Sequence, residues 1–497
     1  MKSRTLIVTV MTLLAALAIV SSAQTVTTLV KFDGTAAPLG GWNSGNAGLT
    51  SLVQGRDGNL WGTTEAGGIP ESGTVFKMTP QGKLTTLHSF HPLVSSTDGQ
   101  FPQSGMVLST NGNFYGTTQK GGLNFGTASH DGTVFTITQG GAFKTIFAFP
   151  NDFNNPPTTD GSQPVATLVE GTDGNLYGTT TTGGHNTCGT VFVITAGGSL
   201  KPLFSFPQVP FCDNPYGTLI QGKDGNFYGT TRGGGAHSHG TVFRITPTGG
   251  FSTLYSFQGS STTGPFDGAS PNAGLIQGSD GNFYGTTEAG GTDNAGTVFK
   301  VTTGGKETVL HSFGGAAFTG FFLDAPLIQA TDGNLYGTTA RGGNTSCFNG
   351  CGTIFRISTA GGLALVHEFT GADGAAPTGG LVQFTDGSFY GVTAAGGNQH
   401  AGCNSGGCGT IFHLVVPGLG PFVKTVPTSG KVGTMVSILG NNLAGATSVK
   451  FNGVAANFVT SSTDIAATVP VGATTGSVTV VTPAGTLSSN VKFRVTP

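Results

Sequence analysis

Few residues in this chain of 497 carry side chains that do chemistry, but one carboxylate recurs at regular spacing. It opens a segment of the form Asp-Gly-Asn-Leu-Tyr-Gly-Thr-Thr. A row of carboxylates suggests cation ligands, yet one in each unit falls short of the about six to eight oxygens that Ca²⁺ takes. Asp-Gly also forms tight β-hairpin turns, where Asn can replace Asp. We therefore interpret these residues as turn formers: Asp57, Asn111, Asp173, Asp224, Asp280, Asp332 and Asp386.

Histidines and residues of mixed charge follow the repeated segment, in stretches whose length differs between copies. A metal or catalytic role for the pair His237 and His239 would need partners from several copies, so we interpret both as solvated loop residues. Mixed charge in this region suits a polar ligand, whereas the alternative interpretation is ordinary surface solubility. We expect no metal and no cofactor. The candidate ligand-binding residues are Glu65, Gln119, Lys120, Arg232, His237, His239, Glu288 and Arg341.

The six cysteines occur in neighbouring pairs in the same variable stretches. Neighbourhood in the sequence predicts three disulfides, because local pairs need little chain rearrangement. The alternative is a four-cysteine metal site formed by the last four residues. The predicted pairs are Cys188–Cys212, Cys347–Cys351 and Cys403–Cys408.

Composition and motifs exclude several classes of function. The net charge of −2 gives no electrostatic reason for nucleic acid as a partner. The Gly-x-Ser-x-Gly, Walker and His-Glu-x-x-His motifs are absent from the sequence. Glu65 and Glu288 are a poor acid/base pair because they lie in nonadjacent units. One fold can host enzymes as well as binding proteins, so the fold alone will not decide between these functions.

Each copy of the repeat predicts four short strands. The first resembles 275–277, the second is the Leu-Tyr-Gly-Thr-Thr segment, the third is a Gly-Thr-Val-Phe segment, and the fourth resembles 251–257. Thr, Val and aromatic residues favour strands, and Asp-Gly favours the hairpin between the first two. Successive copies begin 51 to 62 residues apart, a period typical of propellers or solenoids. Four antiparallel strands in each unit favour a propeller.

The repeated segments also predict how the two ends of the array meet. The second-strand and third-strand segments occur seven times, but the seventh fourth-strand segment stands at the N-terminus, at 25–32. We expect it to pair beside 409–414, which would close a ring and remove an exposed edge. The predicted fold is all-β: a seven-bladed β-propeller closed by the N-terminal strand, followed by a small immunoglobulin-like β-sandwich.

The loops of such a ring divide between two faces. Turns joining first to second and third to fourth strands are short and uniform, and we call their side the uniform face. Loops joining second to third strands, and the connections between units, vary in length and content, and we call their side the variable face. Binding residues tend to lie on variable loops carried by a rigid scaffold. We therefore expect a ligand on the variable face.

The N-terminus predicts export. Lys2 and Arg4 precede an apolar run at 6–20, and Ser21, Ser22 and Ala23 suit cleavage before residue 24. The alternative is an uncleaved membrane anchor. The expected parts are a signal peptide (1–23), the propeller (24–416), a linker (417–421) and the sandwich (422–497). We expect a secreted or cell-surface monomer whose mature chain does not insert into a membrane.

The whole repeat, in order, resembles the GloVer tandem-repeat family of exported bacterial proteins. The C-terminal stretch resembles an IPT/TIG immunoglobulin-like domain, through segments such as 438–443 and 449–453. The resemblance implies a binding, adhesive or surface-scaffold role and brings no catalytic residues. A polysaccharide or a cell-surface protein is the expected partner. The alternatives are an extracellular carbohydrate-active hydrolase or lyase, and a purely structural surface component.

Overall fold

The computed structural model shows an all-β protein, as the sequence predicted. It describes residues 24–32, 50–68, 72–91, 98–122, 131–150, 159–208, 212–259, 267–314, 320–398 and 407–496. These residues form strands and turns and contain no helix. A helix long and apolar enough to cross a membrane is accordingly not found among them.

The first strand of each unit is short and follows a buried Leu or Met. Only two residues of each copy form ladder bonds before the Asp-Gly turn reverses the chain. These strands are β2 (Val53–Gln54), β7 (Val107–Leu108), β12 (Val169–Glu170), β16 (Ile220–Gln221), β20 (Ile276–Gln277), β24 (Ile328–Gln329) and β28 (Val382–Gln383).

The second strands are buried along their whole length because they lie inside the molecule with neighbours on both faces. Their central Gly is required by packing: a Cβ at Gly62 would lie 2.7 Å from the Phe76 ring on the next strand. The strands are β3 (Leu60–Thr64), β8 (Phe114–Thr118), β13 (Leu176–Thr180), β17 (Phe227–Thr231), β21 (Phe283–Thr287), β25 (Leu335–Thr339) and β29 (Phe389–Thr393).

The third strands supply most of the hydrophobic core, since their Val or Ile and Phe side chains are fully buried. A Thr at the start of each bonds the last Thr of the second strand, for example Thr231 and Thr241 at 2.9 Å. The strands are β4 (Thr74–Met78), β10 (Thr133–Ile137), β14 (Thr190–Ile194), β18 (Thr241–Ile245), β22 (Thr297–Val301), β26 (Thr353–Ile357) and β30 (Thr410–Val415).

The fourth strands form the outer edge and are only partly buried. Six of them follow the third strand directly in the sequence, whereas β1 comes from the N-terminus and pairs antiparallel with β30, Thr25 opposite Val415. The strands are β5 (Leu84–Ser89), β11 (Phe143–Ala148), β15 (Leu200–Ser205), β19 (Phe251–Ser256), β23 (Glu307–Ser312), β27 (Leu363–Glu368) and β1 (Thr25–Lys31).

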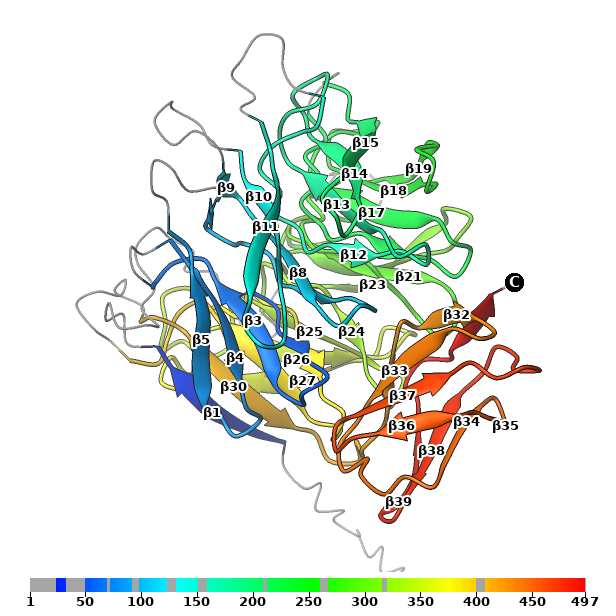
Figure 1. The fold of residues 1–497 in the computed structure, drawn as a ribbon. Coiled ribbons are helices and arrows are strands. Elements are labelled where there is room, and N and C mark those ends of the chain that lie inside the picture. Colours follow the sequence, from blue (N-terminus) through cyan, green and yellow to red (C-terminus); the bar gives the residue numbers. More distant parts are fainter. Residues whose placement is uncertain are drawn as a thin grey trace, which may run out of the picture.

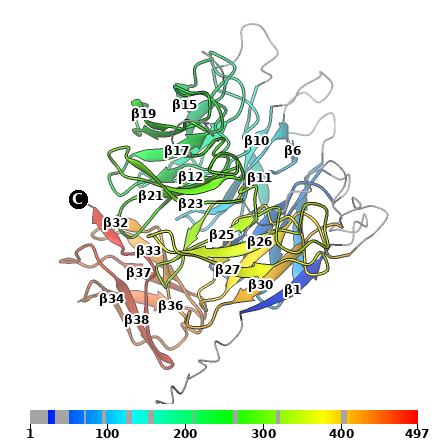
Figure 2. The ribbon, with the colours of Figure 1, turned by 180° about the vertical axis from the view of Figure 1, so that it is seen from behind.

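These strands form seven four-stranded antiparallel sheets within the described residues, which we number sheet 1 to sheet 7 in the order of their first strands. Sheet 7 consists of β28, β29, β30 and β1. A small additional ladder joins β6 (Gly99–Gln100) to β9 (Lys120–Gly121). Figures 1 and 2 show the sheets arranged beside one another, with residues 421–496, in orange and red, on one side of the array.

The C-terminal strands pack as two sheets around a core of their own, which includes Val436, Ile438, Phe451, Ile465 and Val478. One sheet orders β31 (Lys424–Val426), β33 (Met435–Leu439), β37 (Asp464–Thr468) and β36 (Phe458–Thr460). The other orders β35 (Val454–Ala455), β34 (Ser448–Phe451), β38 (Val478–Thr482) and β39 (Gly485–Ser488). A parallel pair joins β32 (Ser429–Lys431) to β40 (Arg494–Thr496).

The C-terminal sheets contact the uniform face, where the Asp-Gly turns lie. The Thr463 hydroxyl donates to the Arg56 carbonyl at 2.7 Å, and the Phe422 amide donates to the Thr385 carbonyl at 3.0 Å. Leu439 is fully buried in a cluster that includes Trp61 and Phe114 of sheets 1 and 2. This packing covers part of the uniform face, whereas Asp173, Asp224, Asp280 and Asp332, in the turns of sheets 3 to 6, are exposed.

Candidate functional site

A cavity of about 420 Å³ lies on the variable face, and all seven units contribute to its wall. We call it the mouth cavity. Six units each place in it the residue four positions before their first strand, and sheet 1 supplies Thr50 and Ser51. Because this position recurs, the variation of its side chain decides what the cavity offers. The six residues are Gln103, Val165, Tyr216, Asn272, Asp324 and Thr378.

A second set of lining residues follows directly after second strands. Glu65, Arg232 and Glu288 come after β3, β17 and β21, and each borders the mouth cavity. The rigid, fully buried second strand therefore fixes where each charged side chain begins. Two recurrent positions, one before a first strand and one after a second strand, build the polar part of the wall.

Sheets 4 to 6 hold a connected cluster of polar side chains in this wall. The Glu288 carboxylate accepts a hydrogen bond from Asn272 Nδ2 at 2.7 Å and pairs with Arg232 Nη2 at 3.2 Å. Asn272 Nδ2 also lies 3.4 Å from Asp324 Oδ1. The Arg232 guanidinium lies 5.9 Å from the centre of the Tyr216 ring, within range of a cation–π contact.

The cluster perturbs one of its own carboxyl groups. The pKa of Asp324 is raised, first by partial desolvation of its carboxyl group and then by the negative charge of Glu288. The residue as a whole is exposed at the cavity wall. Its hydrogen bond with Asn272 and the charge of Arg232 oppose this effect. The cluster thus presents carboxylate acceptors, a guanidinium donor and an exposed aromatic ring within one cavity.

The opposite part of the wall repeats this chemistry on a smaller scale. Gln103 Nε2 of the second unit donates to Glu65 Oε1 of the first at 2.8 Å. Glu65 and Glu288 both line the mouth cavity, but each is engaged by a different neighbour. A carboxylate held by an amide therefore occurs twice around the opening.

Five of the predicted ligand-binding residues lie outside the wall of the mouth cavity. Lys120 Nζ lies 5.8 Å from the centre of the Phe101 ring, and Arg341 Nη1 donates to the Phe348 carbonyl at 3.3 Å. The backbone N–H of Gln119 donates to the Phe101 carbonyl. His237 and His239 are exposed on their loop. In the described part of the chain, no three His, Cys, Asp or Glu side chains are grouped so that they could hold a metal ion.

Sequence reasoning missed Tyr216, Asn272 and Asp324. Their signal was positional: aligning the units on the Leu or Met before each first strand shows one variable residue three positions earlier. In the other four units that residue is Leu, Gln, Val or Thr. The change of residue type at a fixed position identifies the side of the cavity where the polar cluster lies.

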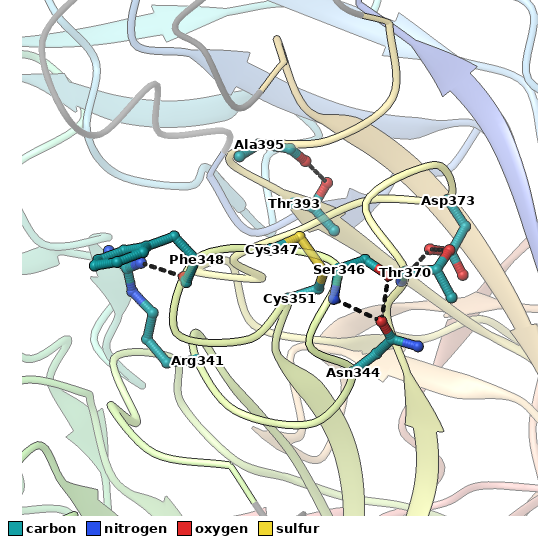
Figure 3. The surroundings of a disulfide bond; sticks show 10 residues. All are labelled: Arg341, Asn344, Ser346, Cys347, Phe348, Cys351, Thr370, Asp373, Thr393 and Ala395. Atoms are coloured by element: carbon teal, nitrogen blue, oxygen red, sulfur yellow. Dashed lines mark hydrogen bonds between the residues drawn. A yellow bond between two sulfur atoms is a disulfide. The ribbon is translucent and has the colours of Figure 1, made fainter. Parts of the chain in front are cut away.

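The disulfides cross-link variable-face loops. Cys188–Cys212 and Cys347–Cys351 are both formed, as predicted. Cys347 and Cys351 are therefore unable to act as thiolate ligands of the alternative metal site. Cys408 is also disulfide-bonded, whereas its predicted partner, Cys403, lies outside the described residues. Figure 3 shows the Cys347–Cys351 loop with Phe348 beside Arg341; Phe348 is 86% exposed.

The turn aspartates have the structural role predicted for them. Asp224 accepts hydrogen bonds from the Asn226 amide at 3.1 Å, from Asn226 Nδ2 at 2.7 Å and from the Tyr228 hydroxyl at 2.7 Å. The same three bonds recur at Asp173, Asp280 and Asp332. These carboxylates are occupied within their own hairpins.

Solved structures show distant likeness to this chain. The extracellular domain of a protein named as a hybrid two component system from B. thetaiotaomicron is 12% identical, with a TM-score of 0.46, over 91% of this chain and 53% of that one. A Bacteroides thetaiotaomicron protein of unknown function is 13% identical, with a TM-score of 0.40, over 79% and 76%. A gluconolactonase from Xanthomonas campestris is 11% identical, with a TM-score of 0.40, over 81% and 93%.

The chain spans about half the length of the first of these structures. We draw no functional conclusion from likenesses of this degree. No curated protein matches the chain.

Family models match almost the whole chain. The Gloeobacter/Verrucomicrobia repeat matches three times, over residues 16–158, 124–268 and 261–454. An IPT/TIG domain matches residues 421–495. Both matches confirm the resemblance found in the sequence. The chain belongs to the Gloeobacter/Verrucomicrobia repeat family, and it carries a C-terminal IPT/TIG domain.

Proposed function

We propose that the seven sheets are the blades of a ring closed by β1, a seven-bladed propeller. Contacts between sheets 7 and 1 support this proposal. Gln54 Nε2 donates to the Thr385 hydroxyl at 2.8 Å, and the Gly380 amide donates to the Ser51 hydroxyl at 2.9 Å. The Tyr390 hydroxyl donates to the Pro80 carbonyl at 3.2 Å. A wall to which all seven units contribute, six of them at one recurrent position, is likewise expected of a ring around an axis.

We propose that this protein is exported and binds a polar ligand, of which a saccharide is the best fit, in the mouth cavity. The observation that carries the proposal is the Arg232–Glu288–Asn272–Asp324 cluster beside Tyr216. Paired carboxylates, an amide and a guanidinium match the dense hydroxyl groups of a sugar, and an aromatic ring can pack on its apolar face. Ser51, Thr167 and Thr378 supply further hydroxyls around the opening.

The position of the C-terminal domain supports a ligand on the variable face. The domain packs against the uniform face, so a large partner such as a polysaccharide would have access from the variable face. The disulfides support export, because such bonds persist in oxidising compartments. The propeller would then present the ligand-binding face, and the IPT/TIG domain would act as a spacer or docking module.

Glycan-array binding followed by calorimetry on the best ligand tests the proposal. Glu288→Gln and Arg232→Gln are each expected to weaken binding at least tenfold, because each removes a charge-assisted contact from the cavity. Arg341→Gln is the matched control: it removes the same charge from the same face, outside the cavity, and should leave affinity unchanged. Equal effects of the Arg232 and Arg341 substitutions would contradict this location of the site.

A second function, an extracellular carbohydrate-active hydrolase or lyase, is favoured by one observation. The pKa of Asp324 is raised, and a carboxyl group with a raised pKa serves as the general acid in glycosidases. Turnover of the bound glycan that disappears in Asp324→Asn, with binding retained, would support this function. Binding without any product would leave the protein as a binding module.

A further inference from the structure

A second cavity, of about 470 Å³, lies between the propeller and the IPT/TIG domain. We call it the junction cavity. One side consists of the first strands of sheets 1 to 4, and the other of β31 and the segment that leads into β40. Its volume falls within the range of about 300–1,000 Å³ typical of small-molecule pockets.

Much of this wall is apolar. Val53, Leu168, Ile220 and Val426 border the cavity and belong to, or pack against, the hydrophobic clusters of the sheets. An inorganic ion would leave this surface without a partner. The apolar wall therefore favours an occupant with a hydrocarbon or aromatic body.

The charged residues around the cavity are predominantly basic. Lys223, Lys424, Lys492 and Arg494 line it, against a single carboxylate, Glu170. That carboxylate is already engaged: it accepts hydrogen bonds from the Ser109 hydroxyl at 2.8 Å and from the Thr110 amide and hydroxyl at 2.8 and 2.7 Å. It is thus committed to the neighbouring turn.

Two of the cations are also committed to backbone groups. Lys223 Nζ donates to the Gly278 and Ser279 carbonyls at 3.2 and 3.4 Å. Arg494 Nη1 donates to the Lys223 carbonyl, which ties the IPT/TIG domain to sheet 4. Within the described residues, no hydrogen bond or ion pair is made by the side-chain ammonium groups of Lys424 and Lys492.

Lys424 lies at the centre of the junction. It is in β31, two residues before Val426, so both side chains leave the same face of the strand toward the propeller. Burial lowers the pKa of its ammonium group, and no nearby carboxylate opposes this effect. Lys424 is only partly buried. A cation partly withdrawn from water without a counter-ion is costly, and an anion beside it reduces that cost.

A buried acceptor on the propeller side is also without a partner. Gln54 borders the cavity and is 1% exposed; its Nε2 donates to Thr385, whereas its Oε1 accepts no hydrogen bond. Polar groups that lack protein partners thus face the cavity from both modules.

We propose that the junction cavity binds a small amphipathic carboxylate, with its anionic head at Lys424 and its apolar body against the first strands of sheets 1 to 4. Such a ligand contacts both modules at once. Its binding stabilises their junction in proportion to ligand concentration. The proposed ligand occupies the junction cavity and not the mouth cavity, although Thr167 borders both.

Calorimetry with decanoate on the full chain tests the proposal, with decanol, acetate and inorganic phosphate as comparison probes. Decanoate is expected to bind, and each comparison probe at least tenfold more weakly, because each lacks either the charge or the apolar body. Equal binding of decanol would show that the charge is irrelevant. Tighter binding of phosphate would show an ion site without an apolar component. Either result, or no binding of decanoate, would overturn the proposal.

Variants locate the site. Lys424→Met keeps the apolar stem and removes the charge, and is expected to weaken decanoate binding at least tenfold. Lys492→Met, at an exposed position where folding is not at risk, should weaken it severalfold. Lys450→Met, on the other sheet of the IPT/TIG domain, is the matched control and should change nothing. Unchanged binding in both the Lys424 and Lys492 variants would overturn the assignment.

Discussion

The turn aspartates show how one side chain specifies a hairpin. In most units the carboxylate accepts three hydrogen bonds, whereas at Asn111 the amide donates to the Tyr115 hydroxyl at 2.8 Å and accepts only from the Asn113 amide at 2.9 Å. Asn thus keeps two of the three contacts by reversing the direction of one. This reversal explains in physical terms why the substitution is tolerated.

Asp224→Ala is expected to lower the free energy of unfolding by about 1–3 kcal/mol, because it removes the acceptor of three hydrogen bonds and leaves the Tyr228 hydroxyl without its partner. Asp224→Asn should cost less, since it recreates the contacts of Asn111. Urea unfolding monitored by circular dichroism measures both. A larger loss for Asn than for Ala would contradict this account of the turn.

The tyrosines of these turns predict an alkaline limit to stability. Burial, together with the hydrogen bond to Asp224 and the charge of that residue, raises the pKa of Tyr228 from 10.0 to about 12. The unfolded chain therefore releases the tyrosine proton before the folded protein does. The stabilisation of the folded protein that comes from the protonated Tyr228 hydroxyl is complete below pH 10.0 and is lost as the pH rises toward about 12.

We accordingly expect the free energy of unfolding to fall between pH 10 and 12. Tyr228→Phe should make that fall shallower, because one proton fewer is released on unfolding. Urea unfolding at a series of pH values compares the two proteins. An identical slope in both would refute the assignment of this effect to Tyr228.

At the scale of elements, a glutamine at the end of the first strand joins one sheet to the preceding one. Gln277 Oε1 accepts from the Lys223 amide of the preceding turn at 2.9 Å, and its Nε2 donates to the Gly281 carbonyl of its own turn at 2.9 Å. Gln221, Gln329 and Gln383 make the same acceptor contact. Glu170 does so with its carboxylate, to the Thr110 amide.

Gln277→Leu is therefore expected to destabilise the protein by about 1–3 kcal/mol, since it leaves a backbone amide and a carbonyl unpaired. Gln277→Glu should cost less, because Glu170 shows that a carboxylate fills the acceptor role. Thermal unfolding of the two variants distinguishes them. Equal losses would mean that packing at this position matters and the hydrogen bonds do not.

Much of the strand content could be predicted from the sequence, because Gly-Thr-Thr and Thr-Val-Phe segments encode burial and turns locally. A second aspartate motif could not be interpreted in this way. Asp-Gly-x-x-Pro occurs at Asp98, Asp160, Asp267 and Asp373, in connections between units. Its carboxylate bonds side chains brought by the preceding fourth strand, such as His88 at 3.0 Å, Tyr255 at 2.5 Å and His367 at 2.9 Å. Only the three-dimensional fold reveals these partners.

Only part of the candidate site was predicted, because some of its residues follow local sequence signals and others depend on the three-dimensional fold. Glu65, Arg232 and Glu288 follow a recognisable strand, so sequence position alone suggested where they lie. Tyr216, Asn272 and Asp324 come from connections of unequal length. Which of their side chains come together depends on how neighbouring sheets pack. This packing is determined by contacts between residues far apart in the chain, such as the hydrogen bond from Gln54 to Thr385.

At the scale of the whole molecule, the two modules share a hydrophobic core. Leu439 ends β33 of the IPT/TIG domain, yet it is fully buried with Trp61, Met106, Leu108 and Phe114 of the propeller. Trp61 replaces the tyrosine found in the other units, and it donates to Asp57 Oδ1 at 3.2 Å. The unit that contains the larger aromatic ring is thus one of those that pack against the IPT/TIG domain.

Leu439→Ala tests whether this shared core couples the two modules. We expect it to cost about 2–5 kcal/mol, as for other buried leucines, and to split a single calorimetric unfolding transition into two, because the cavity it leaves lies between the modules. Trp61 emission should then change with the transition of the junction. Leu443→Ala is the matched control: Leu443 is equally buried, but in the domain's own core, so its loss should weaken the domain without exposing Trp61. The same response in both variants would show that the IPT/TIG domain is attached to the propeller only by its linker and surface hydrogen bonds.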